Sequence, residues 1–338
     1  MAATIRDIKR MTGLSLATVS KYLNGGNVLP ENKAAIEHAI EVLHYEVNEV
    51  ARGLATNRTK TIGVLIQRLD NLFSSTIISK IEDILRGHGY GTIICDCKGE
   101  EKLEEESIRF LLSKRVDGII TLPTATSSGY LERALVRDIP VVLIDRVFED
   151  KEWDSIQVDN EEGGKMAVQK LIENGHTKIA IVCGDEQYYT AKKRLKGYFD
   201  ALEEADLPVY SKYIKRGPLE TSHGFQSVVE LMEMEDPPTA VFLSNYEITL
   251  GAMLAINERD IQVPEDLSVV GFDNMLLAQV VKPKLWMVVQ PMEEIAREAA
   301  ELMLRKLDGG TEEGQITKVV LHTSLTEGAS IKKIGKLT

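Results

Sequence analysis

The sequence has few cysteines and no long apolar run, and both absences narrow the kind of protein that it can be. Three cysteines, Cys95, Cys97 and Cys183, are too few for a disulfide framework in 338 residues. Cys95 and Cys97 share one face of an expected strand, which favours packed thiols over metal ligands or a disulfide. No apolar stretch is long enough to cross a bilayer, and no secretory signal is visible. We therefore expect a soluble, cytoplasmic protein without a membrane partner.

Motifs of catalysis and of cofactor binding are missing as well. The Gly164-Lys165 pair is followed by Met166, so it does not form a phosphate-binding loop. The glycine-rich segment 87–91 follows a helix and precedes a strand, the reverse of the order in the dinucleotide fingerprint. Six histidines show no metal-ligand spacing, and the segment 127–129 is not a nucleophile elbow. The sequence thus predicts no cofactor, no metal site and no catalytic residue.

The net charge of -12 argues against a nucleic-acid partner until its distribution is considered. Residues 1–60 hold eight basic and six acidic residues, a balance of +2 that leaves -14 for the remainder. Attraction to phosphate is therefore confined to one end of the chain. Because that end is only mildly basic, a single copy should bind DNA weakly, which points to a dimer.

The first 24 residues show the pattern of a helix-turn-helix. Thr4 is a plausible N-cap, and Ile5, Ile8 and Met11 recur behind it at helical spacing. After a break at Thr12-Gly13, Ser15 can cap a second helix, in which three residues form an apolar stripe and four face outward. The stripe is Leu16, Val19 and Leu23, and the outer face is Ala17, Thr18, Ser20 and Lys21. A small, hydroxyl-rich face with one cation suits the major groove, although a plain helical hairpin would show the same spacing.

A third helix is expected from about Pro30, with an apolar stripe that would close a three-helix core. The segment 48–57 has a weak helical signal with Gly53 in its middle. Such a short helix should not be stable alone in water. We therefore expect a linker that becomes helical only when contacts with another molecule or domain order it.

From Thr61 onward, short β-rich runs alternate with amphipathic helices, which predicts a doubly wound α/β body. The expected strands are 62–66, 92–97, 118–122, 141–144, 179–183, 240–244 and 268–272, and helices are expected at 75–87 and 293–307. The segment 59–64 is loosely echoed by 176–181, which suggests two similar halves. Ligands of such sheets bind beyond the carboxyl ends of the strands, in the cleft between two lobes.

Polar side chains and one aromatic ring follow these strands, and they suit a polyhydroxylated ligand. A carboxylate can accept from two neighbouring hydroxyls, a guanidinium can donate to their oxygens, and a phenyl ring can cover an apolar sugar face. Each residue also has a structural alternative: a strand-end Asp often caps a helix, and Arg194 could be a surface cation. The candidate effector residues are Phe73, Asp145, Arg146, Arg194, Asn245 and Asp273.

Taken together, these motifs resemble the lactose/galactose repressor (LacI/GalR) family over essentially the whole chain. The resemblance rests on ordered motifs at family-like intervals, among them Ala17-Thr18-Val19-Ser20, Pro140-Val141-Val142-Leu143-Ile144-Asp145-Arg146, Arg194-Leu195-x-Gly197-Tyr198, Val270-Gly271-Phe272-Asp273 and Gln290-Pro291. It implies a homodimer that reads a palindromic operator in double-stranded DNA under the control of a small, sugar-like effector. It also implies a three-helix head on a periplasmic-binding-protein-like body. The implied units are a head at 1–47, a hinge at 48–60 and a body at 61–338, with lobe 1 at about 61–160 and 290–322 and lobe 2 at about 161–289 and 323–338.

The same resemblance assigns roles in DNA binding. Leu16, Ala17 and Lys21 fall on base-reading positions, although periodicity alone allows Leu16 to be a core residue equally well. Leu54 falls where the family inserts a hinge leucine into the minor groove, a wedge that kinks the duplex. The full expected DNA-binding set is Thr4, Ser15, Leu16, Ala17, Thr18, Ser20, Lys21, Asn24, Asn48, Ala51, Arg52 and Leu54.

Three departures from the family pattern stand out. Val47 replaces a usual proline before the hinge, Tyr246 replaces a usual acidic residue, and Trp286 replaces a small hydroxyl residue in a strand between the lobes. Tyr246 and Trp286 could both reshape the cleft. The alternatives to a repressor are a cytoplasmic sugar-binding protein without a DNA role and a metabolic enzyme with an N-terminal appendage. The helix-turn-helix argues against the first, and the missing active-site motif argues against the second.

Overall fold

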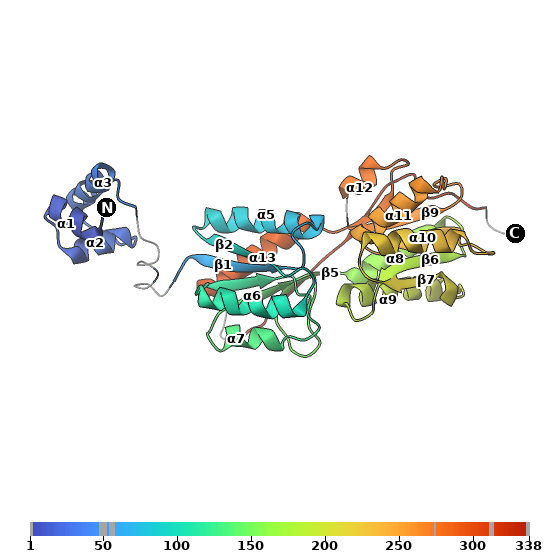
Figure 1. Cartoon of the computed structure of the whole chain (residues 1–338), viewed down its shortest axis with the longest axis horizontal. Helices are drawn as coiled ribbons and strands as arrows, with labels where there is room; N and C mark the ends of the chain where they lie inside the picture. Colours follow the sequence, from blue (N-terminus) through green and yellow to red (C-terminus); the bar gives the residue numbers. More distant parts are fainter. Residues whose placement is uncertain (1–2, 47–52, 54–57, 274, 311–313, 336–338) are drawn as a thin grey trace.

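The structure is a computed structural model that describes residues 3–46, 53, 58–273, 275–310 and 314–335. Three helices form the N-terminal head at one end of the molecule: α1 (Ile5–Thr12), α2 (Leu16–Leu23) and α3 (Pro30–Leu43) (Figure 1). The head is followed along the chain by two α/β lobes, and each lobe is built on its own sheet.

Local signals in the sequence account for the head helices. The Asp7 carboxylate accepts from both the backbone N–H and the hydroxyl of Thr4, so the expected cap begins α1. Gly13 ends that helix at a φ of 70°, a left-handed conformation that glycine adopts without strain. Ser15 then caps α2 by accepting from the N–H of Thr18 at 3.0 Å. The three helices enclose a small core of Ile8, Val19, Ile36 and Ala39.

Lobe 1 contains a six-stranded parallel sheet in the order β11-β5-β4-β3-β1-β2. The strands are β1 (Thr61–Ile66), β2 (Gly91–Asp96), β3 (Gly118–Thr121), β4 (Val141–Ile144), β5 (Asp154–Val158) and β11 (Lys318–Leu321). The helices are α5 (Leu72–Gly87), α6 (Glu101–Ser113), α7 (Glu132–Leu135) and α13 (Met292–Leu307).

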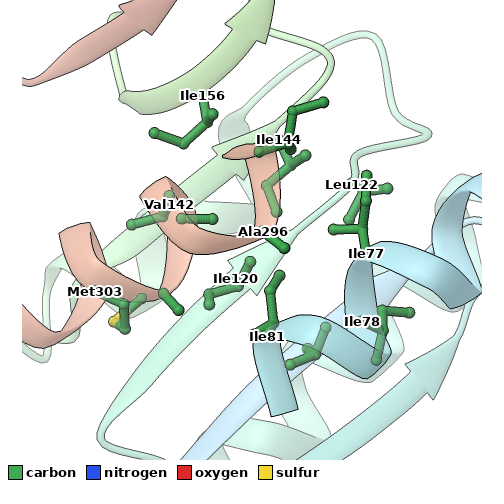
Figure 2. Packing of buried hydrophobic residues seen from close by; sticks show 14 of the residues in the cluster. Ile77, Ile78, Ile81, Ile120, Leu122, Val142, Ile144, Ile156, Ala296 and Met303 are labelled. Carbon is green, nitrogen blue, oxygen red and sulfur yellow. The ribbon is translucent and has the colours of Figure 1, made fainter. Parts of the chain in front are cut away.

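Helices cover both faces of this sheet. Figure 2 shows the core on one face, where Ile77 and Ile81 of α5 and Met303 of α13 pack against strand residues such as Ile120. Residues of β1 alternate between this core and a second one on the other face beneath α6, because successive side chains of a strand point to opposite faces. The expected doubly wound architecture is therefore confirmed.

Lobe 2 contains a six-stranded sheet in the order β12-β10-β9-β8-β6-β7, parallel except for the antiparallel pair β10–β12. The strands are β6 (Ile179–Gly184), β7 (Ile214–Gly217), β8 (Ala240–Leu243), β9 (Ser268–Asp273), β10 (Trp286–Val289) and β12 (Ser324–Thr326). The helices are α8 (Asn160–Glu173), α9 (Tyr189–Glu204), α10 (Thr221–Met232), α11 (Tyr246–Glu258) and α12 (Met275–Val280).

The two sheets repeat one strand order, and this repetition gives the echo between residues 59–64 and 176–181 a structural basis. β1 lies second from the edge of its sheet, between β2 and β3. β6 has the same position in the other sheet, between β7 and β8. The lobes are interleaved in sequence, since the chain enters lobe 2 after β5, returns to lobe 1 at α13 and leaves again after β11.

Some sequence expectations of the elements were wrong or incomplete. The helix expected at 75–87 begins at Leu72, because Asn71 caps it by accepting from the N–H of Ser74, so Phe73 lies in a helix and not in a loop. Strands β5, β7, β10, β11 and β12 were not in the expected set. The thiol prediction is confirmed: Cys95 and Cys97 are both free, and burial raises the pKa of Cys97 to about 12.

Two absences can be stated for the part of the chain that the structure describes. None of its helices is both long and apolar enough to span a bilayer. Within those same residues, no group of three or more His, Cys, Asp or Glu side chains is arranged to hold a metal ion.

Candidate functional site

The outer face of α2 carries most of the expected DNA-contacting residues of the head. Ala17 and Lys21 are exposed, and Thr18 and Ser20 are half-buried. Leu16 is 39% exposed and lies outside the buried core of the head, which settles its open assignment against a core role. The grouping of Leu16 with Val19 in one apolar stripe was therefore wrong. The face presented to solvent includes the three residues with expected base-reading roles.

Hydroxyl groups at the ends of the head helices are already engaged in caps. The Thr4 hydroxyl bonds the Asp7 carboxylate at 2.7 Å, and the Ser15 hydroxyl lies 2.8 Å from that of Thr18. Asn24 donates to the Ser20 hydroxyl at 3.3 Å. The first contact orders the start of α1, and the other two order the two ends of α2.

The expected hinge contacts cannot be placed. Asn48, Ala51, Arg52 and Leu54 lie outside the described residues, as does Val47. Their roles stay predictions.

A cavity of about 310 Å³ lies between the two lobes. Its wall contains all six candidate effector residues, which are dispersed over 200 positions of the chain. Lobe 1 contributes Phe73 from the first turn of α5 and the pair Asp145-Arg146 from the end of β4. Lobe 2 contributes Arg194 of α9, Asn245 at the start of α11 and Asp273 at the end of β9.

Close packing of α8 on α9 positions Arg194. A Cβ on Gly164 would lie 2.4 Å from the Arg194 carbonyl oxygen, and one on Gly197 would lie 2.1 Å from the Glu161 carbonyl oxygen. Only glycine fits at such an approach. The two helices therefore come close enough for the Arg194 Nε–H to donate to the Asn160 amide oxygen at 2.8 Å.

The charged groups of the lobe 2 wall form a network around Arg194, which is 4% exposed, while the Ser244 hydroxyl and Gln290 Oε1 beside it are buried without a hydrogen-bond partner. Its Nη1 donates to the Ser244 carbonyl at 2.7 Å, its Nη2 lies 3.5 Å from Asp273 Oδ1, and its guanidinium stacks on the Phe272 ring. The Asp273 carboxylate also accepts from the Tyr246 N–H and from the Gln290 side chain. A buried charge with this many partners is both oriented and stabilised.

The lobe 1 wall differs, because its charged groups have unpartnered atoms. Asp145 Oδ1 and Arg146 Nε are both buried without a hydrogen-bond partner. Burial raises the pKa of Asp145, since a low-dielectric site disfavours the carboxylate, while Arg194 and Arg146 oppose that rise. A buried polar atom without a hydrogen-bond partner costs free energy. A ligand atom that bonds it would therefore stabilise the protein–ligand complex.

The cavity wall also contains Asn71, Glu247 and Gln290, which were not among the candidate effector residues. Asn71 of lobe 1 donates to Glu247 of lobe 2 at 3.3 Å, and Glu247 also accepts from the Thr221 hydroxyl at 3.1 Å. Asn71 could have been found as the N-cap of α5, since Asn favours that position. Gln290 was noted only as part of a motif, although it lines the cavity and is 3% exposed.

Neither Tyr246 nor Trp286 lines this cavity, although the Tyr246 N–H donates to the cavity residue Asp273. The expectation that these departures reshape the cleft stays a prediction. Trp286 packs within the lobe 2 core, with the Lys170 ammonium 4.7 Å from its ring centroid. An acidic side chain does line the cavity one residue later, at Glu247.

The cavity wall offers recognition chemistry: donors, acceptors and one ring. Arg146 and Arg194 donate, Asp145 and Asp273 accept, and Asn245 uses its side-chain oxygen to cap α11 through the Ile248 N–H. The structural alternative for Asn245, a helix cap, is therefore realised in a residue that also lines the cavity. Phe73 supplies the aromatic face.

Comparisons with known proteins agree with this architecture. Residues 168–331 match the model of a periplasmic binding protein-like domain. The chain is 36% identical to catabolite control protein A of Priestia megaterium over 94% of this chain and 97% of that protein. It is 35% identical to the HTH-type transcriptional repressor PurR of Vibrio atlanticus over 98% of this chain and 99% of that protein. These relatives are regulators of transcription and not enzymes.

Solved structures extend the likeness to the fold. A lac repressor dimer bound to operator has a TM-score of 0.87 at 24% identity, with 98% of this chain and 100% of that chain covered. A LacI family transcriptional regulator from Enterococcus faecium with bound ribose has a TM-score of 0.72 at 28% identity, with 81% of this chain and 99% of that chain covered. From its head, its two lobes and its near full-length relatives, the chain belongs to the LacI/GalR family of DNA-binding transcriptional regulators.

Proposed function

We propose that the protein is a repressor that binds a palindromic operator as a homodimer and senses a sugar-like effector in the cavity between its lobes. One observation carries this proposal: the cavity wall gathers all six candidate effector residues from both lobes. A ligand held by both lobes changes the free energy of one lobe arrangement relative to others, which is the requirement for control at a distance.

The chemistry of the wall favours a polyhydroxylated ligand. Among the described residues that line the cavity, Phe73 is the one aromatic side chain, and it faces a wall rich in amide, hydroxyl, carboxylate and guanidinium groups. A single ring can cover one face of a sugar, and the polar groups can pair with its hydroxyls. The ribose bound by the Enterococcus faecium relative supports the same class of ligand.

We propose that the chain works as a head (1–47), a hinge (48–60) and a two-lobed body (61–338). Leu16, Ala17 and Lys21 would read bases, since all three are exposed on α2. Thr4, Ser15, Thr18, Ser20 and Asn24 would contact phosphates or hold α2 in place. In this proposal the hinge contributes Asn48, Ala51, Arg52 and the Leu54 wedge. Residues 1–60, the head and hinge together, carry a net charge of only +2, so pairing of two heads by the body is necessary for tight binding.

A fluorescence anisotropy titration tests the DNA role. We expect tighter binding to a palindromic duplex than to a scrambled one of equal length, with a steep salt dependence for both. Equal affinity for the two duplexes at every salt concentration would support the alternative, a cytoplasmic sugar-binding protein without a DNA role.

Two variants separate base reading from folding. Leu16→Ala should weaken palindrome binding and leave the melting temperature within the range of surface substitutions, because Leu16 is exposed. Leu54→Ala should weaken binding to the palindrome and spare salt-driven binding to scrambled DNA. Equal loss on both duplexes for Leu54→Ala would contradict the wedge.

A thermal-shift screen of sugars and sugar acids on the full chain tests the effector class. A true effector should raise the melting temperature in proportion to the logarithm of its concentration above its Kd. Arg194→Ala and Asp273→Ala should abolish that shift. A normal shift in both variants would remove these residues from the site.

A further inference from the structure

A second cavity, of about 420 Å³, lies across the lobes on the other side of Arg146. Lobe 1 contributes the segment 123–126 and residues 146, 147 and 149, and lobe 2 contributes the segment 186–189 and Lys192. Arg146 is the one residue that lines both cavities among the described residues. None of the other residues of this wall belongs to the proposed effector site.

Two polar atoms of this wall are buried and unpartnered. Thr124 is 8% exposed, and its hydroxyl has no hydrogen-bond partner. Arg146 is 9% exposed, and its Nε–H also has none, while its Nη1 reaches only the Pro123 carbonyl at 3.5 Å. Buried polar atoms of native proteins are normally satisfied by protein, water or ligand. A ligand group that accepts a hydrogen bond from Arg146 and forms another with the Thr124 hydroxyl would therefore satisfy both atoms.

Among the described residues that line this cavity, Lys192 and Arg146 are the cations, and only Arg146 makes no ion pair. Lys192 donates to Glu149 at 2.8 Å, and Glu186 is paired with Arg216 at 2.9 Å. Glu104 lies behind the wall, but its oxygens are taken by the Thr124 and Ala125 N–H groups and by the Tyr130 hydroxyl. Asp145 makes no hydrogen bond to the guanidinium of its neighbour among the described contacts.

An aromatic ring lies beside the Arg146 guanidinium. The guanidinium carbon is 4.9 Å from the Tyr188 ring centroid, within the range of a cation–π contact, which uses none of the hydrogen-bonding capacity of an acceptor atom. The edge of a guanidinium matches the paired oxygens of a carboxylate or phosphoryl group. A desolvated guanidinium beside an unpartnered hydroxyl is therefore a suitable partner for an oxyanion in the second cavity.

We propose that this second cavity is a separate binding site for a small oxyanion, a carboxylate or phosphoryl group, held by Arg146 and the Thr124 hydroxyl. The site gives the protein a second input, since its walls come from both lobes as those of the effector cavity do. The Lys192–Glu149 bridge joins the lobes at its rim.

Isothermal titration of the full chain with inorganic phosphate and, separately, with acetate tests the site at constant ionic strength. Thr124→Val is the informative variant, because it removes the hydroxyl and keeps the side-chain volume. Ser222→Ala is the matched control, since Ser222 lines only the first cavity. Glycerol serves as the neutral probe.

We expect at least one anion to bind the wild type and Ser222→Ala, and Thr124→Val to weaken that binding about tenfold, the effect of one hydrogen bond to a charged group. Binding of phosphate without acetate identifies a phosphoryl ligand, and the reverse identifies a carboxylate. We also expect Thr124→Val to melt no lower than the wild type, because its hydroxyl has no partner to lose.

Three results would overturn the proposal. One is binding of neither anion to the wild type, or of glycerol alone. Another is unchanged anion affinity in Thr124→Val. A lower melting temperature of ligand-free Thr124→Val would show that the hydroxyl already has a structural partner.

Discussion

Asp145 and Asp273 occupy corresponding positions in the two lobes, and their surroundings are opposite. Each ends the fourth strand of its sheet, counted from the β2 or β7 edge, and each has a positive φ, 69° and 90°. Asp273 accepts from Tyr246 and Gln290 and faces Arg194. Asp145 Oδ1 has no partner, and burial raises the pKa of this carboxyl.

Because of this difference, we expect the two walls of the effector cavity to respond differently to ligand binding. The lobe 2 wall is organised before any ligand arrives, because its charges satisfy one another. The lobe 1 wall holds buried polar atoms that a ligand would satisfy, so ligand binding should stabilise lobe 1 groups most. Strain at positive φ in both aspartates agrees with a role in ligand binding, where such conformations gather. The predictions below test this contrast, beginning with the largest effect.

Arg194→Ala should give the largest loss, about 3–5 kcal/mol in the free energy of unfolding, because it leaves Asp273 buried without its cation. Chemical denaturation measures the loss. Lys193→Ala on the same helix is the control, and it should cost less than about 1 kcal/mol, since its ion pair with Glu161 is exposed. A similar small loss in both variants would show that the lobe 2 network does not stabilise the fold.

Asp273→Asn and Asp145→Asn should separate the two carboxylates. Asp273→Asn replaces an acceptor that two donors use, and it should cost about 1–3 kcal/mol. Asp145→Asn removes a poorly compensated buried charge and should leave stability unchanged or raise it. Equal destabilisation by the two substitutions, measured by urea unfolding, would break the contrast between the walls.

The contrast should also appear as a pH dependence. Because the pKa of Asp145 is raised in the folded state, the folded protein binds this proton more tightly than the unfolded chain does. The contribution of Asp145 to stability is therefore present at low pH and is lost as pH rises from the ordinary value of 3.8 through the raised one. The stability of the wild type relative to Asp145→Asn should fall over that window. A difference that grows with pH instead would mean that the folded state favours the carboxylate.

The smallest effects should come from the two asparagines that cap helices at the cavity. Asn71→Ala and Asn245→Ala should each cost about 1 kcal/mol, the usual value of a lost N-cap. Asn71→Ala also removes the contact with Glu247 between the lobes, so ligand-free lobe opening should become easier in that variant alone. Small-angle scattering of the two variants would detect the difference, and identical profiles would rule out a role for this contact.

Much of the fold could be predicted from sequence where the signals are local. Caps at Thr4 and Ser15, the glycine break at residue 13 and the apolar stripe of α3 all lie within a few residues of the structure that they specify. Several of the seven expected strands are apolar throughout, because helices cover both faces of each sheet. Strands β5, β7, β11 and β12 lack that signature, since they lie at or near sheet edges and carry polar residues.

The six candidate effector residues were found from strand ends and a family resemblance, but their partners were not. Asp273 is satisfied by Tyr246 and Gln290, which the fold brings close from other positions in the chain, and Asp145 Oδ1 has no such partner. Likewise, Leu16 shares the helical spacing of core residues, and only the three-helix packing shows that it faces solvent. The packing of Trp286 against the lobe 2 core depends on the sheet order, which local sequence patterns do not show.

The central claim is that a ligand in the cavity between the lobes changes the affinity of the head for DNA. The most direct measurement is the Kd for a palindromic duplex, by fluorescence anisotropy, with and without a sugar that thermal shift shows to bind the wild type and not Arg194→Ala. The account predicts a change of about 5-fold to 150-fold in the wild type, the usual range of allosteric coupling, and none in the variant. An unchanged Kd in the wild type, at a sugar concentration that saturates the cavity, would contradict it.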